Sequence, residues 1–165
     1  MRQNKEKLMR VYFENPEKSF SVRELSKVTG IPRASVHSEV INLKKEGLVD
    51  SEGYAKTGFL FKAKKSNYFE EKLFEYGMVD FLVKELNPSL IFLFGSFAKG
   101  ESNKESDIDL FVESSVKKDV SLKKFESKLG HKIDLFVRKD LYDLQKHLLN
   151  NVVNGIKLYG SFRVK

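Results

Sequence analysis

The sequence predicts an α+β protein of two units, a small helical unit followed by a mixed sheet that helices flank. Residues 1–66 show three helical segments and two short strand signals, whereas residues 67–165 alternate strand and helix signals. The charge balance changes at the same point. Residues 1–66 hold 14 Lys and Arg against 8 Asp and Glu, and residues 67–165 hold 16 against 15. We therefore place the domain boundary between residues 66 and 67.

The composition narrows the class of protein. Hydrophobic residues make up 41% and charged residues 32% of the 165 residues, which is typical of a globular chain. The absence of Cys excludes disulfides and thiolate metal sites. The longest apolar run, Leu90–Phe94, is far too short to cross a bilayer, and the N-terminus has no signal-peptide core. We expect a cytoplasmic protein with no membrane partner. The excess positive charge of residues 1–66 fits a polyanionic partner or an ordinary solvated surface.

The first two helices follow from apolar spacing and from capping residues. Residues 4–14 carry apolar side chains at helical intervals and stop at Asn15-Pro16. Ser21 and Glu24 have the spacing of a capping box and open a short helix that Gly30 closes.

A third helix and a hairpin complete the first unit. Pro32 suits the first turn of a helix over residues 33–46, which Gly47 ends. Two short strands, Leu48-Val49 and Phe59–Phe61, are predicted to follow on either side of a polar loop. The buried face of the third helix is assigned to Ala34, Val36, Val40 and Leu43.

This order of helices, turn and hairpin resembles the winged helix-turn-helix family, above all in the stretch IPRASVHSEVINLKKEGLV. The resemblance implies that the third helix enters the major groove of double-stranded DNA, where Arg or Asn can read base edges. Such modules also serve as dimerisation or protein-docking units, and winged-helix regulators are commonly homodimers. The candidate DNA contacts are Arg33, Ser35, His37, Ser38 and Asn42 in that helix and Lys56, with Lys62, Lys64 and Lys65, near the hairpin.

The second unit alternates strands and helices. A long amphipathic helix is predicted over residues 67–86, before Pro88. Strands are predicted at Leu90–Phe94, Ile108–Val112 and Lys132–Val137, with a helix over residues 121–129 between the last two. Asp140 is the expected N-cap of a final helix through Val152, and residues 155–159 could add a terminal strand.

A glycine turn and three aspartates carry the chemistry of the second unit. Gly95 permits a sharp turn after the first strand, and Ser96 begins a helix whose free N–H groups and hydroxyl attract phosphate. Asp107 and Asp109 lie two residues apart on a strand edge, so both carboxylates project from one face. Asp134 stands in an otherwise apolar strand, where a lone buried carboxylate would be costly. If the two strands are neighbours, three carboxylates meet at one place, which suits Mg²⁺ or Mn²⁺.

The run GSFAKG-ESNKE-SDIDLFV resembles the minimal nucleotidyltransferases of the DNA polymerase beta superfamily, whose signature is G-S-x-A-x-G followed by S-D-I-D-L. The resemblance spans residues 67–165 and implies a polymerase-beta-like nucleotidyltransferase domain. It implies that Gly95 and Ser96 hold the nucleotide phosphates and that Asp107, Asp109 and Asp134 bind metal and catalyse. Lys99 stands where Arg is common, which keeps the charge but loses the bidentate fork.

The implied reaction is metal-dependent transfer of a nucleoside monophosphate, AMP from ATP or another NMP from its triphosphate, to a hydroxyl acceptor. Minimal nucleotidyltransferases of this kind often act as antitoxins that modify a partner toxin, so a toxin-like protein is a candidate acceptor. The alternative is a winged-helix transcriptional regulator whose second domain binds nucleotide or a partner without turnover.

Overall fold

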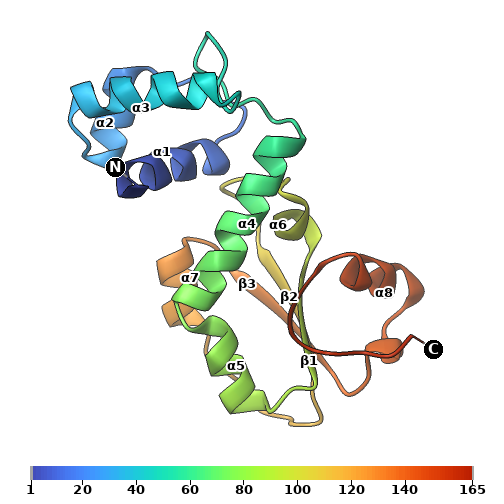
Figure 1. Ribbon diagram of the computed structural model, residues 1–165. Helices are drawn as coiled ribbons and strands as arrows, with labels where there is room; N and C mark the ends of the chain where they lie inside the picture. The colour runs from blue at the N-terminus through green and yellow to red at the C-terminus, as the bar shows by residue number, and fades with distance from the viewer. Residues whose placement is uncertain (1, 165) are drawn as a thin grey trace. The chain divides into compact units, whose positions relative to one another are not determined.

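A computed structural model describes residues 2–164. The chain divides into two compact units, with the boundary in the sequence between Ala63 and Lys64. The first unit contains helices α1 (Arg2–Glu14), α2 (Val22–Thr29) and α3 (Arg33–Lys45), shown in blue to cyan in Figure 1. Their apolar faces enclose a small core that includes Leu8, Tyr12, Leu25, Val36 and Leu43.

Capping residues set the ends of α2. The Ser21 hydroxyl accepts a hydrogen bond from the Glu24 backbone N–H at 3.2 Å, and Glu24 Oε2 accepts one from the Ser21 N–H at 2.8 Å. This capping box was predicted, as was the end of the helix at Gly30, which has a left-handed backbone (φ 70°) at the C-cap. The short turn Ile31-Pro32 then brings the chain directly into α3.

The predicted hairpin is only partly present. After α3, the part of the chain that the structure describes forms one isolated β-bridge, between Val49 and Ala55. The prediction of a second strand at Phe59–Phe61 is wrong. Phe59–Phe61 instead begins helix α4 (Phe59–Glu75). The physical reason is a four-residue repeat, in which Phe61, Lys65, Phe69 and Leu73 form one buried helical stripe. Because Lys65 interrupts the apolar residues of this stripe, the sequence does not show a clear helical period there.

The single helix predicted over residues 67–86 is also wrong. The structure has α4 to Glu75 and a second helix, α5 (Met78–Leu86), separated by a turn. Gly77 adopts the left-handed conformation (φ 73°), which glycine enters at little cost, and the chain changes direction there.

The second unit is built on a mixed four-stranded sheet, as predicted. The strands are β1 (Leu90–Phe94), β2 (Ile108–Glu113), β3 (Ile133–Arg138) and β4 (Ile156–Gly160), in the order β3-β2-β1-β4. β1 runs antiparallel to β2 and β4, whereas β2 and β3 are parallel, joined by a crossover through α7 (Lys123–Leu129). β3 is therefore an edge strand.

Helices cover both faces of the sheet (Figure 1). On one face, Phe92, Phe94 and Phe111 pack with Val152 of α8 (Lys146–Val153). The other face lies toward α5 and α7, whose Phe81 and Phe125 rings are 5.1 Å apart. Asp140 does act as an N-cap, but of a short 3-10 turn, Leu141–Asp143, and α8 begins only at Lys146.

No helix within residues 2–164 is both long enough and apolar enough to cross a membrane.

Candidate active site

The turn after β1 is formed by Gly95 and lies against the carboxylate of Asp109 on β2. Gly95 has φ 70°, and α6 (Gly95–Lys99) begins at this residue. A Cβ atom at position 95 would collide with Oδ2 of Asp109. Glycine is therefore needed here twice, for the left-handed backbone and for the space that the carboxylate fills.

The strand register brings two of the aspartates together. Asp109 pairs with Phe94 across the antiparallel ladder and with Asp134 across the parallel one. Residues in register on adjacent strands project from the same face, so the Asp109 and Asp134 carboxylates are neighbours. Asp107 lies two residues before Asp109, just ahead of β2, and is close enough for its charge to raise the pKa of Asp109. All three residues lie at the edge of the sheet where β1 ends.

The electrostatics of Asp109 reflect this crowding. Burial raises the pKa of the Asp109 carboxyl above its ordinary value, and the negative charges of Asp134 and then Asp107 raise it further. Asp109 is half-buried, whereas Asp107 and Asp134 are exposed. The folded chain thus keeps Asp134 and Asp107 close enough to Asp109 for their charges to act on it.

Asp134 lies on the strand next to that of Asp109, as expected, but its side chain is not buried. The expectation of a buried carboxylate in the centre of an apolar strand is wrong, because β3 is an edge strand and Asp134 is its exposed second residue. The cost of burial therefore does not explain Asp134. Its relation to Asp109 comes from the register alone.

The three carboxylates supply the hard oxygen donors that Mg²⁺ and Mn²⁺ prefer, and their mutual repulsion is what a cation relieves. Within residues 2–164, no three Asp, Glu, His or Cys side chains are already gathered around one metal-sized point. The three carboxylates therefore suit a divalent cation in their chemistry. Their side chains would have to turn toward the cation in order to bind it.

Ser96 and Lys99 follow the glycine turn. Ser96 is half-buried near the start of α6, and its carbonyl oxygen accepts a hydrogen bond from the Glu101 N–H at 2.8 Å. Lys99 is exposed in the last turn of α6 and forms no ion pair with any residue that the structure describes. Both side chains are accessible to an anion at the turn.

Three side chains that were not assigned to the site from the sequence anchor α6 and the loop that leads from it to Asp107. Lys65 is only 1% exposed and donates to the carbonyl oxygen of Ser102. The Ser66 hydroxyl donates to the Ala98 carbonyl oxygen at 2.9 Å. His131 is 5% exposed, and its Nδ1 lies 2.8 Å from the Ser106 carbonyl oxygen. The assignment of Lys65 to a DNA surface is therefore wrong.

Of these three residues, His131 could have been suspected from the sequence because of its nearness to Asp134. His131 stands three residues before Asp134, in the turn that leads into β3. Lys65 occupies an apolar position of its helix, which becomes visible only after the helical period is recognised.

The candidate DNA contacts lie in the first unit. Within α3, Val36, Val40 and Leu43 are buried as predicted, but Ala34 is exposed because it lies on the opposite side of the helix. The residues proposed to face DNA leave a solvent-accessible surface on α3 and in the loop after it: Arg33, Ser35, His37, Ser38 and Lys56 are exposed, and Asn42 is half-buried.

Comparison with known proteins gives the family. The model of the nucleotidyltransferase domain family matches residues 77–163, which is 87 of the 165 residues and includes Gly95, Ser96 and all three aspartates. No curated protein gave a match. A solved structure described as a crystal structure of a toxin-antitoxin with AMP-PNP is 28% identical, with a TM-score of 0.40, over 56% of this chain and 73% of that chain. The chain is a nucleotidyltransferase and belongs to the nucleotidyltransferase domain family.

Proposed function

We propose that this nucleotidyltransferase transfers a nucleoside monophosphate, AMP from ATP as the first candidate, to a hydroxyl acceptor with the help of Mg²⁺ or Mn²⁺. The observation that supports the proposal is the position of Asp109, which lies against the Gly95 turn, in register with Asp134 and within the electrostatic influence of Asp107. Carboxylates held together against their own repulsion are characteristic of sites that bind cations or move protons.

The chain's own residues can be given roles in this reaction. Gly95 and Ser96 hold the terminal phosphates at the turn, and Lys99 offsets their charge. Asp107 and Asp109 would hold divalent metal, which would supply positive charge to neutralise the phosphates. Asp134 accepts the proton of the acceptor hydroxyl. The hydroxyl oxygen then forms a bond to the α-phosphorus, the bond from that phosphorus to the bridging oxygen breaks, and pyrophosphate leaves.

The test is label transfer from α-³²P-ATP in the presence of Mg²⁺ and candidate acceptor proteins. We expect transfer by the wild type and a loss of at least about a hundredfold in Asp109→Asn. Glu105→Gln is the matched control, since it also converts a carboxylate to an amide near the site but lies outside the cluster. Equal transfer by Asp109→Asn and Glu105→Gln would refute the proposed site.

For the acceptor, we propose a hydroxyl on a partner protein, in keeping with the resemblance to antitoxin nucleotidyltransferases. The candidate partner is a small protein encoded beside this one. Incubation of the purified pair should label the partner and not this chain. Label on this chain alone would instead indicate self-modification.

We also propose that residues 1–66 form a winged helix-turn-helix that binds double-stranded DNA, with residues 67–165 as the catalytic domain. The exposed polar surface of α3 supports this second function, as does the positive charge of the first unit. A gel-shift titration at rising salt tests it. Arg33→Ala should weaken binding, whereas Lys27→Ala on α2 should matter less. Binding to DNA without label transfer to any acceptor would favour a regulator that lacks turnover.

A further inference from the structure

A basic groove lies away from the aspartates, at the end of β2 and β3. It has a volume of about 560 Å³ and is lined by residues 114–119, which follow β2, and by Val137, Arg138 and Lys139. A second hollow of about 430 Å³ continues from it along β3 and shares Lys118, Asp119 and Val137. The groove thus opens at the carboxyl ends of the parallel strand pair, where open α/β sheets commonly bind ligands.

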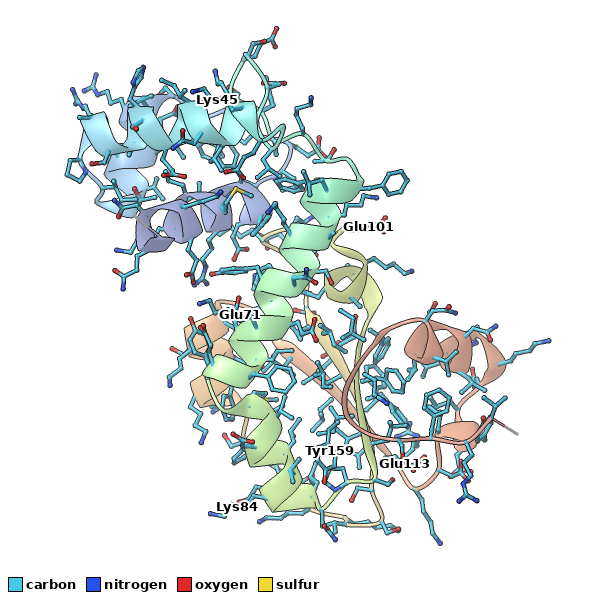
Figure 2. All side chains as sticks on the ribbon, viewed as in Figure 1. Lys45, Glu71, Lys84, Glu101, Glu113 and Tyr159 are labelled. Atoms are coloured by element: carbon cyan, nitrogen blue, oxygen red, sulfur yellow. The ribbon has the colours of Figure 1, made fainter. Side chains whose placement is uncertain are left out.

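The groove and the aspartates lie on opposite faces of the sheet. Leu135 and Val137 line the hollows and alternate along β3 with Asp134 and Phe136. Figure 2 labels Glu113, which marks the far end of β2 from Asp109. Ser114 lies five positions after Asp109, which is about 17 Å along a strand. A ligand in the groove would therefore not touch the catalytic carboxylates.

The lining of the groove and of the second hollow is basic. It includes Lys117, Lys118, Lys123, Arg138 and Lys139 against Asp119 and Glu126. Lys118 forms an ion pair with Glu85. In contrast, Lys117, Arg138 and Lys139 are exposed and form no ion pair with any residue in the described part of the chain. Three cations thus converge on a hollow with little to neutralise them.

The lining also limits the chemistry of the ligand. Its apolar members are aliphatic, so it offers no aromatic surface on which a base could stack. One carboxylate, Asp119, opposes the cations, and Glu126 of the second hollow accepts a hydrogen bond from the Ile133 N–H at 3.0 Å. Charge attraction without stacking suits linked phosphate groups rather than nucleobases.

We infer that this groove is a second ligand site, which binds a chain of linked phosphates through Lys117, Arg138 and Lys139. The phosphate ligand is either the backbone of a nucleic acid or a free polyphosphate. The site is independent of the nucleotide site at Gly95 and does not require the proposed transfer reaction.

The experiment is isothermal titration calorimetry of the full chain with inorganic tripolyphosphate, in EDTA at 50 mM salt. The variant Lys117→Ala/Arg138→Ala/Lys139→Ala should bind about tenfold more weakly, since each exposed contact contributes a fraction of a kcal/mol to about 1 kcal/mol. The control Lys84→Ala/Lys128→Ala/Lys157→Ala removes the same charge elsewhere on the unit and should lose no more than about twofold. Asp119→Asn should strengthen binding by about twofold.

Four outcomes decide the proposal. The proposal is overturned if the two triple variants lose affinity equally or if the wild type does not bind tripolyphosphate. It is also overturned if affinity is lost in Lys99→Ala instead of in the groove variant. A loss confined to the groove variant would support it. A parallel titration with decathymidylate then identifies the source, because a nucleic-acid ligand should bind this probe more tightly than tripolyphosphate and lose affinity in the same variant.

Discussion

Nδ1 of His131 lies 2.8 Å from the backbone carbonyl oxygen of Ser106, the residue that immediately precedes Asp107. A carbonyl oxygen can only accept, so Nδ1 carries the proton and donates. The imidazole is buried edge-to-face against Phe97 and Phe69, with centroid separations of 4.8 and 5.6 Å. A rigid ring from the start of β3 thus fixes the residue before the first aspartate of β2.

His131→Phe tests this positioning role. Phenylalanine retains an aromatic ring against Phe69 and Phe97 but cannot donate to Ser106, whose carbonyl oxygen is then left without this partner. We expect kcat to fall by about tenfold with a smaller change in KM for ATP, because Asp107 becomes less well placed. His131→Ala should lose similar activity and melt at a clearly lower temperature, since it also leaves a cavity. Full activity in His131→Phe would show that the ring acts only in packing.

Asp109→Asn should stabilise the metal-free protein while it abolishes transfer. The pKa of Asp109 is raised in the folded state, so the folded chain binds more protons than the unfolded chain between the two pKa values. Stability therefore falls as pH rises through this window, and the destabilising effect is complete at neutral pH. We expect Asp109→Asn to melt about 1 to 3 °C higher at pH 7 in EDTA, and the difference to vanish near pH 3. Melting curves at the two pH values check this, with Glu105→Gln as the control. A lower melting temperature at pH 7 would contradict it.

Gly95→Ala and Gly77→Ala form a matched pair. Both glycines have a left-handed backbone, with φ 70° and 73°, so alanine costs each about 1 to 2 kcal/mol of backbone strain. They differ in space, because a Cβ atom at position 95 meets Asp109 and one at position 77 meets nothing within 4 Å. We expect both variants to lose stability but only Gly95→Ala to lose transfer, by about a hundredfold or more. Parallel melting curves and transfer assays check this, and equal transfer by both would mean that the turn does not shape the site.

The strands of the second unit were the easiest part of the fold to predict. Leu90–Phe94 is an unbroken apolar run bounded by turn residues, and its limits in the structure are those predicted. The helix at Phe59 was missed because Lys65 occupies a buried position of its stripe, where a charged residue argues against burial. The break at Gly77 was missed because a single glycine is often tolerated within a helix.

The site could be predicted only as far as local motifs reach. Gly95, Asp107 and Asp109 lie within 15 residues of one another, so their residue types and spacing are informative. The pairing of Asp134 with Asp109 depends on the strand order, and the anchoring by Lys65 and His131 depends on tertiary packing. Neither relation has a sequence period that would reveal it.

Tyr12→Phe should stabilise the first unit, by an amount that grows in alkali. The Tyr12 hydroxyl is buried and has no hydrogen-bond partner among the described residues, which costs free energy that phenylalanine would not. Burial, with a smaller effect from the charge of Asp50, raises the pKa of Tyr12 to about 12. The unfolded chain releases this proton near pH 10, before the folded chain does, so the wild type loses stability between these values. We expect urea unfolding to give a gain of about 0.5 to 1 kcal/mol for Tyr12→Phe at pH 7 and a larger gain at pH 11. A difference that stays constant over this range would mean that the hydroxyl ionises as readily in the folded chain as in the unfolded one.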